Sequence, residues 1–299
     1  MKKYAFYADY LKNYITQEHY IFTKNLEKYG WIVMSIGSVD VETIKKEKCI
    51  VLCNTYDTFD ITVFRCSNVF LIYKLDDLYP FKEVRSKCVN SANFIVGPYQ
   101  YLYHNKEILK MYPRLKKKRS SLISYSAVNE FYENIEFNTQ AKMKIFVSGA
   151  IGIPYPFRKY VVQNLKDYIE LLEHPGYEVT DKRVVGHDYY KKMNEYICCF
   201  TDASKFSYVL LKVYEICSVG SLLLVDDTVK LQLNEIGFED NINCIMCNKE
   251  NIQEKIIWIV NNKVAVDTIR KNGMILVREN HNTLKRSIEF NNVIMSLGI

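Results

Sequence analysis

Two stretches in the second half of the chain combine residue types that can bind a phosphorylated ligand. The first is the run 148–152, which begins Ser148-Gly149, follows an apolar stretch and leads toward Arg158. Small residues let backbone amides approach an anion, and a guanidinium can donate to two phosphate oxygens at once. The run fits no complete phosphate-loop consensus, so an ordinary strand-to-helix turn and a surface arginine stay open as alternatives.

The second stretch, 207–220, carries more information. Its apolar spacing predicts a helix over 208–218, capped by a preceding serine, whose free amides could meet a phosphate. Lys212 and Glu215 are three residues apart and therefore share a helix face. A carboxylate in this place can accept hydrogen bonds from two neighbouring hydroxyls, as on a ribose. An intrahelical salt bridge is the alternative, and spacing alone does not choose between them.

Carboxylate pairs follow two apolar runs, Asp76-Asp77 in the first half and Asp226-Asp227 in the second. Such pairs can orient sugar hydroxyls, act as a base or hold Mg²⁺, although either can also cap a turn. None of the five histidines forms a metal-spaced pair. The one Cys-x-x-Cys, at 244–247, lacks a second pair, so a buried strand is favoured there and no metal site is predicted.

These residues must be positioned by alternating strands and helices, because short apolar runs alternate with amphipathic stretches along the chain. That alternation predicts α/β architecture with parallel sheets. The expected strands are 4–7, 31–36, 49–53, 69–73, 94–96, 144–147, 196–200, 222–225 and one at Cys244. The expected helices are 18–29, 158–172, 208–218, 252–261, one closed by Gly273, and 281–299.

Length and composition indicate a globular protein of about two domains, since the 299 residues are 48% hydrophobic and 25% charged. The polar stretch 132–140 separates the two patterns, so the predicted domains are 1–140 and 141–284. No apolar run approaches the ~20 residues that span a bilayer, and the N-terminus has no signal-peptide core. We therefore expect a soluble, cytoplasmic protein with reduced cysteines.

Forty basic and 34 acidic residues leave a net charge of +6. This excess suits a polyanionic ligand such as a nucleotide, but it is below the density of a dedicated nucleic-acid binder. Nucleic acid is therefore not an expected partner. The one dense basic cluster, 116–119, is interpreted as a solvated loop rather than as a binding patch.

From 144 to about 290 the sequence resembles the nucleotide domain of group 1 glycosyltransferases. The resemblance rests on Ser148-Gly149, on the run Tyr-Pro-Phe-Arg that ends at Arg158, and on Lys-x-x-Glu-x-x-x-x-Gly over 212–220, which an apolar strand follows. The first half matches more loosely, through 74–78 and 92–96. The Tyr/Lys/Asn-rich chain is most similar to glycosyltransferases of large algal viruses.

The resemblance implies a GT-B fold, with two Rossmann-like domains whose parallel sheets face each other across a cleft, and a C-terminal helix (about 285–299) that packs back on the first domain. It implies transfer of a hexose from a nucleotide-sugar, by default UDP-glucose, to a glycan or glycoprotein, with retention of anomeric configuration. If the protein is viral, the cytoplasm in which it is expected is that of the host cell. No metal is obligatory in the family, although Mg²⁺ or Mn²⁺ can assist.

By the same resemblance, Glu215 would hold the ribose hydroxyls, and Lys212 and Arg158 would lie near the diphosphate. Asp77 takes the place of the family's acceptor-side histidine. The predicted catalytic residues are therefore Asp77, Arg158 and Lys212, and the predicted donor-binding residues are Ser148, Gly149, Arg158, Ser207, Tyr208, Lys212 and Glu215.

The sequence departs from the family at one position, because the first of the family's two spaced glutamates falls on Ser207. A non-catalytic nucleotide-sugar-binding protein is therefore one alternative. A sugar transferase that modifies DNA bases is another, and it would give the basic cluster 116–119 a task.

Overall fold

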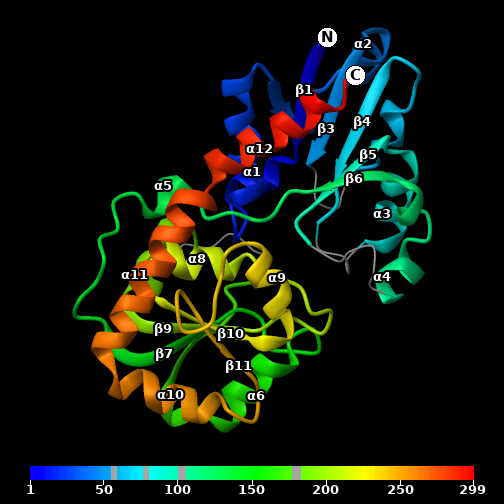
Figure 1. The fold of residues 1–299 in the computed structure, drawn as a ribbon. Coiled ribbons are helices and arrows are strands. Elements are labelled where there is room, and N and C mark those ends of the chain that lie inside the picture. Colours follow the sequence, from blue (N-terminus) through cyan, green and yellow to red (C-terminus); the bar gives the residue numbers. More distant parts are fainter. Residues whose placement is uncertain (55–58, 77–80, 100–105, 177–182) are drawn as a thin grey trace. The chain divides into compact units, whose positions relative to one another are not determined.

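The computed structural model describes residues 1–54, 59–76, 81–99, 106–176 and 183–299. The chain forms two compact units (Figure 1). Unit 1 comprises Met1–Ser124 and Thr283–Ile299, and unit 2 comprises Tyr125–Asn282. Each unit is built on one parallel sheet, as the alternation of strands and helices predicts.

Unit 1 contains a six-stranded sheet in the order β2-β1-β3-β4-β5-β6, with every neighbouring pair parallel. Strand β3 is buried along its whole length, as expected for an apolar run covered on both faces. The strands are β1 Lys2–Tyr7, β2 Ile32–Ser35, β3 Cys49–Asn54, β4 Val69–Lys74, β5 Phe94–Gly97 and β6 Arg119–Leu122. The helices are α1 Glu18–Asn25, α2 Val41–Lys46, α3 Lys82–Ser91, α4 Lys106–Met111 and α12 Thr283–Ser296, with 3₁₀ turns at Asp9–Asn13, Leu26–Tyr29, Ile36–Ser38, Ile61–Phe64 and Leu115–Lys117.

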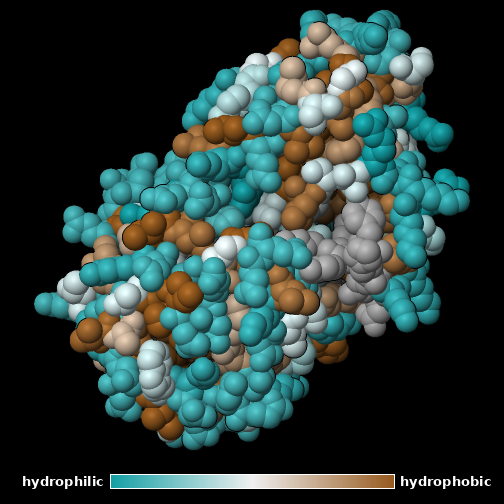
Figure 2. Space-filling model, viewed as in Figure 1, coloured by the Kyte–Doolittle hydropathy of each residue, from teal (hydrophilic) through white to brown (hydrophobic). Residues whose placement is uncertain are grey.

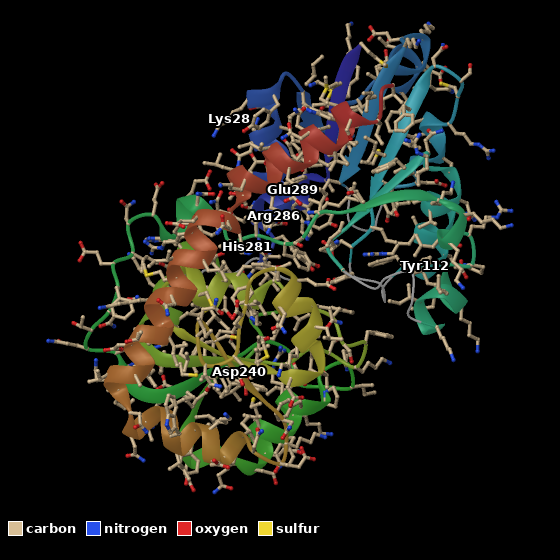
Figure 3. All side chains as sticks on the ribbon, viewed as in Figure 1. Lys28, Tyr112, Asp240, His281, Arg286 and Glu289 are labelled. Atoms are coloured by element: carbon tan, nitrogen blue, oxygen red, sulfur yellow. The ribbon has the colours of Figure 1, made fainter. Side chains whose placement is uncertain are left out.

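The C-terminal helix α12 packs against α1 and is part of the core of unit 1 (Figure 1). Phe290 is fully buried, with its ring centroid 5.7 Å from that of Phe22 and 5.4 Å from that of Trp31. Figure 3 shows Arg286 and Glu289 on α12, and their side chains form an ion pair at 2.7 Å. Burial of aromatic rings is a large apolar contribution, so this contact fixes the end of the chain to unit 1.

Unit 2 contains a five-stranded parallel sheet in the order β11-β10-β9-β7-β8. The chain order reverses between β7 and β9, which are neighbours. The strands are β7 Lys142–Ser148, β8 Ile169–Leu172, β9 Tyr196–Thr201, β10 Leu222–Asp226 and β11 Ile245–Cys247. The helices are α5 Asn129–Tyr132, α6 Pro156–Asn164, α7 Gly186–Asn194, α8 Lys212–Ser218, α9 Lys230–Glu235, α10 Ile252–Asn261 and α11 Lys263–Asn280, with 3₁₀ turns at Lys166–Tyr168 and Asp227–Val229.

The polar stretch before β7 is part of unit 2, whereas the sequence analysis placed the domain boundary at 140/141. Two arginines of α11 bind its carbonyl groups. Arg278 Nη2 donates to the carbonyl oxygens of Tyr132 at 3.2 Å and Ile135 at 2.6 Å, and Arg270 Nη2 donates to that of Asn138 at 3.0 Å. Polar backbone without a partner in its own segment is thus hydrogen-bonded by distant side chains.

Two predicted helices were wrong in extent. The helix expected over 158–172 ends at Asn164, and Ile169–Leu172 is the edge strand β8. The apolar spacing matched a helix although a tight turn separates the two elements. Helix α8 begins at Lys212, four residues later than expected, and Leu211 precedes it without a side-chain cap. Ser207 does not cap it because its φ of +50° places it in a turn.

The sequence predicted that Gly273 closes a helix. In the structure, Gly273 lies within α11. A Cβ at this position would lie 2.6 Å from the carbonyl oxygen of Asn243, which is closer than atoms can pack. The glycine therefore lets α11 approach the loop before β11.

We expect Gly273→Ala to lower the free energy of unfolding by about 1–3 kcal/mol, because the loop must move to make room for the methyl group. Chemical denaturation would measure the change. Gly152→Ala is the matched control, since the nearest atom to a Cβ there is 3.8 Å away. Equal stability of the two variants would contradict the packing argument.

On the face shown in Figure 2, hydrophilic side chains predominate and apolar ones form small patches. Within the described ranges, none of the helices combines the length and the apolar character that crossing a bilayer requires.

Candidate functional site

The carboxyl ends of β7 and β9 mark the place where a ligand site is expected in unit 2. Strand order reverses between these neighbours, and open α/β sheets bind ligands at such a reversal. Strand β7 ends at Ser148, and Asp202 directly follows β9. The predicted donor-binding residues lie at the end of β7, in the loops after β7 and β9, and on the helices that follow these loops, α6 and α8.

Gly149 lies between two cationic side chains at this edge. A Cβ on Gly149 would lie 3.1 Å from Cε of Lys212 and 3.2 Å from Nη1 of Arg158. Its φ of +98° is a conformation that side chains other than glycine rarely adopt. The tertiary structure therefore brings Gly149, Arg158 and Lys212 together, and the glycine leaves the space between the two cations free of side-chain atoms.

The ammonium group of Lys212 contacts two hydroxyl groups. Its Nζ donates to the Tyr189 hydroxyl at 2.7 Å and to Ser148 Oγ at 3.3 Å, and these two hydroxyls are 2.6 Å apart. Burial raises the pKa of Tyr189, so its hydroxyl stays protonated at neutral pH. Within the described ranges, no carboxylate lies at ion-pair distance from Lys212, which is half-buried. The ammonium group of Lys212 is thus positioned by hydrogen bonds to neutral hydroxyl groups.

The charge of Arg158, by contrast, is paired with a carboxylate. It is 1% exposed, its Nη2 donates to Asp202 Oδ1 at 2.8 Å, and its backbone NH donates to Oδ2 of the same carboxylate at 3.1 Å. Nη1 donates to the carbonyl oxygen of Ala150 at 3.0 Å, and the guanidinium lies 4.4 Å from the centroid of the Tyr155 ring. Burial raises the pKa of Asp202, while the charge of Arg158 opposes that shift. Arg158 therefore holds the loop after β7 in place.

The remaining predicted donor residues lie on α8 or before it. Glu215 is buried one turn after Lys212, and its charge contributes to raising the pKa of Tyr189. Ser207 and Tyr208 lie in the loop between β9 and α8. Ser207 is exposed, whereas Tyr208 is buried with its ring stacked on Phe206 at 6.1 Å. The contacts that join Ser148, Gly149, Arg158 and Lys212 do not include these two residues.

Sequence reasoning assigned no role to Tyr189, Asp202, His174 or Arg183. Burial lowers the pKa of His174, and the charges of Lys212, Arg158 and Arg183 lower it further, so three cations act on this one ring. Asp202 could have been found, because it is the polar residue directly after a buried strand. The same signal selected Asp76 and Asp226.

Asp226 and Asp227 cap and fix a turn. Asp226 Oδ1 accepts from the backbone NH of Thr228 at 3.0 Å, and Asp227 Oδ2 accepts from Asn248 Nδ2 at 2.8 Å. In the part of the chain that the structure describes, no group of three or more potential ligands is placed to hold a metal ion.

The other predicted acidic pair lies at the carboxyl end of β4 in unit 1. Asp77 is outside the described residues, and its role stays a prediction. Asp76 is buried and contacts His19 Nε2 at 3.0 Å and the Tyr99 hydroxyl at 3.2 Å. Lys74 Nζ lies 2.9 Å from His19 Nδ1 and 3.3 Å from Glu18 Oε2. A neutral His19 can accept from Lys74 and donate to Asp76, so the imidazole links the ammonium group to the carboxylate.

Burial lowers the pKa of His19, and so does the charge of Lys74, against the opposing charges of Asp76 and Glu18. The unfolded chain binds a proton near pH 6.5, whereas the folded chain resists it. The contribution of His19 to the free energy of unfolding is therefore fully present above about pH 6.5. It decreases as the pH drops below that value, by up to about 1.4 kcal/mol per pH unit.

We expect His19→Gln to flatten this acid loss between pH 7 and 5, as measured by the midpoint of thermal unfolding at each pH. His187→Gln, on α7, is the control and should keep the wild-type slope. If both variants follow the wild-type curve, His19 does not cause the acid sensitivity.

Two all-parallel sheets in one chain, each with a reversal of strand order after its first strand, define the GT-B fold, and solved structures confirm this class. Sucrose-phosphate synthase from Thermosynechococcus elongatus matches over 99% of both chains, with a TM-score of 0.67 and 11% identity. Anabaena HepE in complex with UDP and glucose matches over 99% of this chain and 100% of its own, with a TM-score of 0.64 and 11% identity. An alpha-glucosyltransferase in complex with UDP and a 13-mer DNA matches over 99% of both chains, with a TM-score of 0.63 and 9% identity.

No protein-family model matches the sequence, and no curated protein sequence matches it. The structural likeness therefore establishes the fold.

Proposed function

We propose that the protein is a glycosyltransferase that moves a hexose from a nucleotide-sugar, UDP-glucose by default, to a glycan or glycoprotein acceptor, with retention of anomeric configuration. One observation carries the proposal. Lys212, beside the side-chain-free space at Gly149, is a half-buried cation whose contacts are hydroxyl groups. A half-buried charge of this kind is suited to a ligand of opposite charge.

The chemistry of glycosyl transfer fits this arrangement. Negative charge develops on the diphosphate as the bond to the sugar breaks, and a preorganised cation stabilises it without reorganisation. Lys212 would contact the diphosphate, the hydroxyls of Ser148 and Tyr189 would donate beside it, and Glu215 would accept from the ribose. Arg158 would act by holding the loop at Gly149. Because Lys212 supplies positive charge at this place, the proposed transfer requires no metal ion, and Mg²⁺ or Mn²⁺ would only add to that charge.

The choice of a uridine nucleotide has support from proteins of similar fold. HepE has been solved with UDP-glucose, and the alpha-glucosyltransferase with UDP. On the acceptor side, Asp77 is our proposed base, and Asp77→Asn would test it through loss of transfer with unchanged UDP affinity.

The first test is thermal stability of the full chain with UDP, UDP-glucose, GDP-mannose or no ligand, each with and without Mg²⁺ or Mn²⁺. A ligand at 100 times its dissociation constant adds about 2.7 kcal/mol, enough to raise the melting temperature by at least about 2 °C. We expect a shift with the uridine compounds alone, which would then be assayed for transfer. No shift with any nucleotide would reject the proposal.

A further inference from the structure

A cationic cavity lies in unit 1, at the amino ends of β4, β5 and β6. These strands are parallel and adjacent, so their first residues share one edge of the sheet. The cavity has a volume of about 610 Å³ and is lined there by Val69, which begins β4, Asn93, which precedes β5, and Arg119, which begins β6. Asp76 follows the opposite, carboxyl end of β4, so this cavity is separate from that cluster.

Four basic side chains line the cavity: Arg65, Lys117, Lys118 and Arg119. The first, second and fourth are exposed, and no carboxylate of the described ranges forms an ion pair with any of the four. Together they carry four positive charges. Like charges gathered without counter-charges repel one another, so an anion bound among them would relieve that repulsion.

Lys118 is the member of this group that is hydrogen-bonded to the backbone. Its Nζ donates to the carbonyl oxygens of Asn90 at 2.8 Å and Ala92 at 2.6 Å, at the C-terminal end of α3. Burial lowers the pKa of Lys118, and the charges of Arg114 and Arg65 lower it further. The neighbouring arginines are therefore close enough for their charges to act on Lys118.

The other lining groups indicate the kind of anion. Ser67, Asn90, Ser91 and Asn93 offer hydroxyl and amide groups, and among the lining residues that the structure describes none is aromatic or acidic. Bases of single-stranded nucleic acids are held on aromatic rings, which this cavity lacks. Its volume is that of a small-molecule site. The lining thus favours a compact, charge-dense oxyanion over a stacked base.

We propose that this cavity binds a compact polyanion that carries two or more phosphate groups, at a site separate from the donor site of unit 2. The proposal goes beyond the transferase function and does not depend on it. Arg65 and Arg119 would donate to the phosphate oxygens, and Lys117 would add charge at the rim.

Calorimetric titration of the full chain with inorganic tripolyphosphate, at two salt concentrations, tests the proposal. We expect the double variant Arg65→Gln/Arg119→Gln to weaken one binding event at least tenfold, and higher salt to weaken it in the wild type. The double variant Lys28→Gln/Lys82→Gln removes the same charge from exposed positions elsewhere on unit 1 and should change the affinity less than twofold. Lys212→Met should leave this event intact, because it alters only the site in unit 2.

Three results would overturn the proposal: no binding of tripolyphosphate, equal weakening by the two double variants, or loss of the binding event in Lys212→Met.

Binding of duplex DNA is measured as a further experiment. If it binds through Arg65 and Arg119 while tripolyphosphate does not compete, the surface recognises an extended nucleic acid instead. Vesicles with and without a bisphosphorylated inositol lipid, with tripolyphosphate as competitor, would distinguish a lipid headgroup from a free polyphosphate as the source of the same chemistry.

Discussion

Lys212→Met should reduce the turnover number with UDP-glucose by about 10²–10³-fold, the usual effect of removing one preorganised group that stabilises developing charge. Methionine keeps the length and the apolar stem of the side chain but removes its positive charge. Ser148 and Tyr189 can still bond to each other at 2.6 Å, so the local structure has a way to persist without the lysine. Steady-state kinetics would give the change in kcat, and thermal unfolding would show that the fold is intact.

Lys191→Met is the matched control, because it is the same substitution at an exposed position of α7. It should leave kcat and UDP affinity unchanged. Wild-type turnover in Lys212→Met would remove this residue from the donor site. Lost turnover with unchanged UDP affinity would indicate that Lys212 acts on the transition state alone.

Asp202→Asn should lower the free energy of unfolding of unit 2 by about 3–5 kcal/mol, because it leaves the buried charge of Arg158 without its counter-charge. The carboxylate meets both the guanidinium and the backbone NH of Arg158. Because burial raises the pKa of Asp202 even beside Arg158, the intact pair is not expected to be a large source of stability. The expected loss comes from leaving the arginine unpaired.

A double variant tests this reasoning directly. Asp202→Asn/Arg158→Met should be more stable than Asp202→Asn alone, since the stranded charge is gone and the two effects are coupled. Asp188→Asn, at an exposed site on α7, is the control and should change stability by less than about 0.5 kcal/mol in urea unfolding. A double variant that is less stable than either single one would contradict the argument.

The central strands and the edge strands β2 and β11 could be predicted from the sequence, whereas the edge strands β6 and β8 could not. Cys49–Asn54 and Leu222–Asp226 are continuous apolar runs because both faces of the strand are covered. Strands β6 and β8, at the sheet edges, are mostly half-buried and have no such run. One was therefore missed and the other was merged with the preceding helix.

The sequence pattern also failed to predict the roles of Gly273 and of the polar stretch before β7. A glycine after an apolar helical pattern is typical of a helix end, but here a loop from elsewhere requires the missing side chain. The polar stretch has the composition of a linker, yet Arg270 and Arg278 bind its carbonyl groups from more than 100 positions away. The composition of a segment shows that it is polar, but it does not show which distant side chains form hydrogen bonds with its backbone.

Local pattern by itself determined that the chain forms two parallel α/β sheets, and it selected Ser148, Gly149, Arg158 and Lys212 as candidate ligand-binding residues. Only the tertiary structure decided which of the two cationic side chains, Arg158 or Lys212, is without a carboxylate partner among the described residues. Arg158 and Lys212 look equivalent in the sequence, but Asp202, 44 residues from Arg158, neutralises the arginine, while Lys212 meets hydroxyl groups. The physical reason is that electrostatic energy depends on distance in space, which the fold sets and the order of residues does not show.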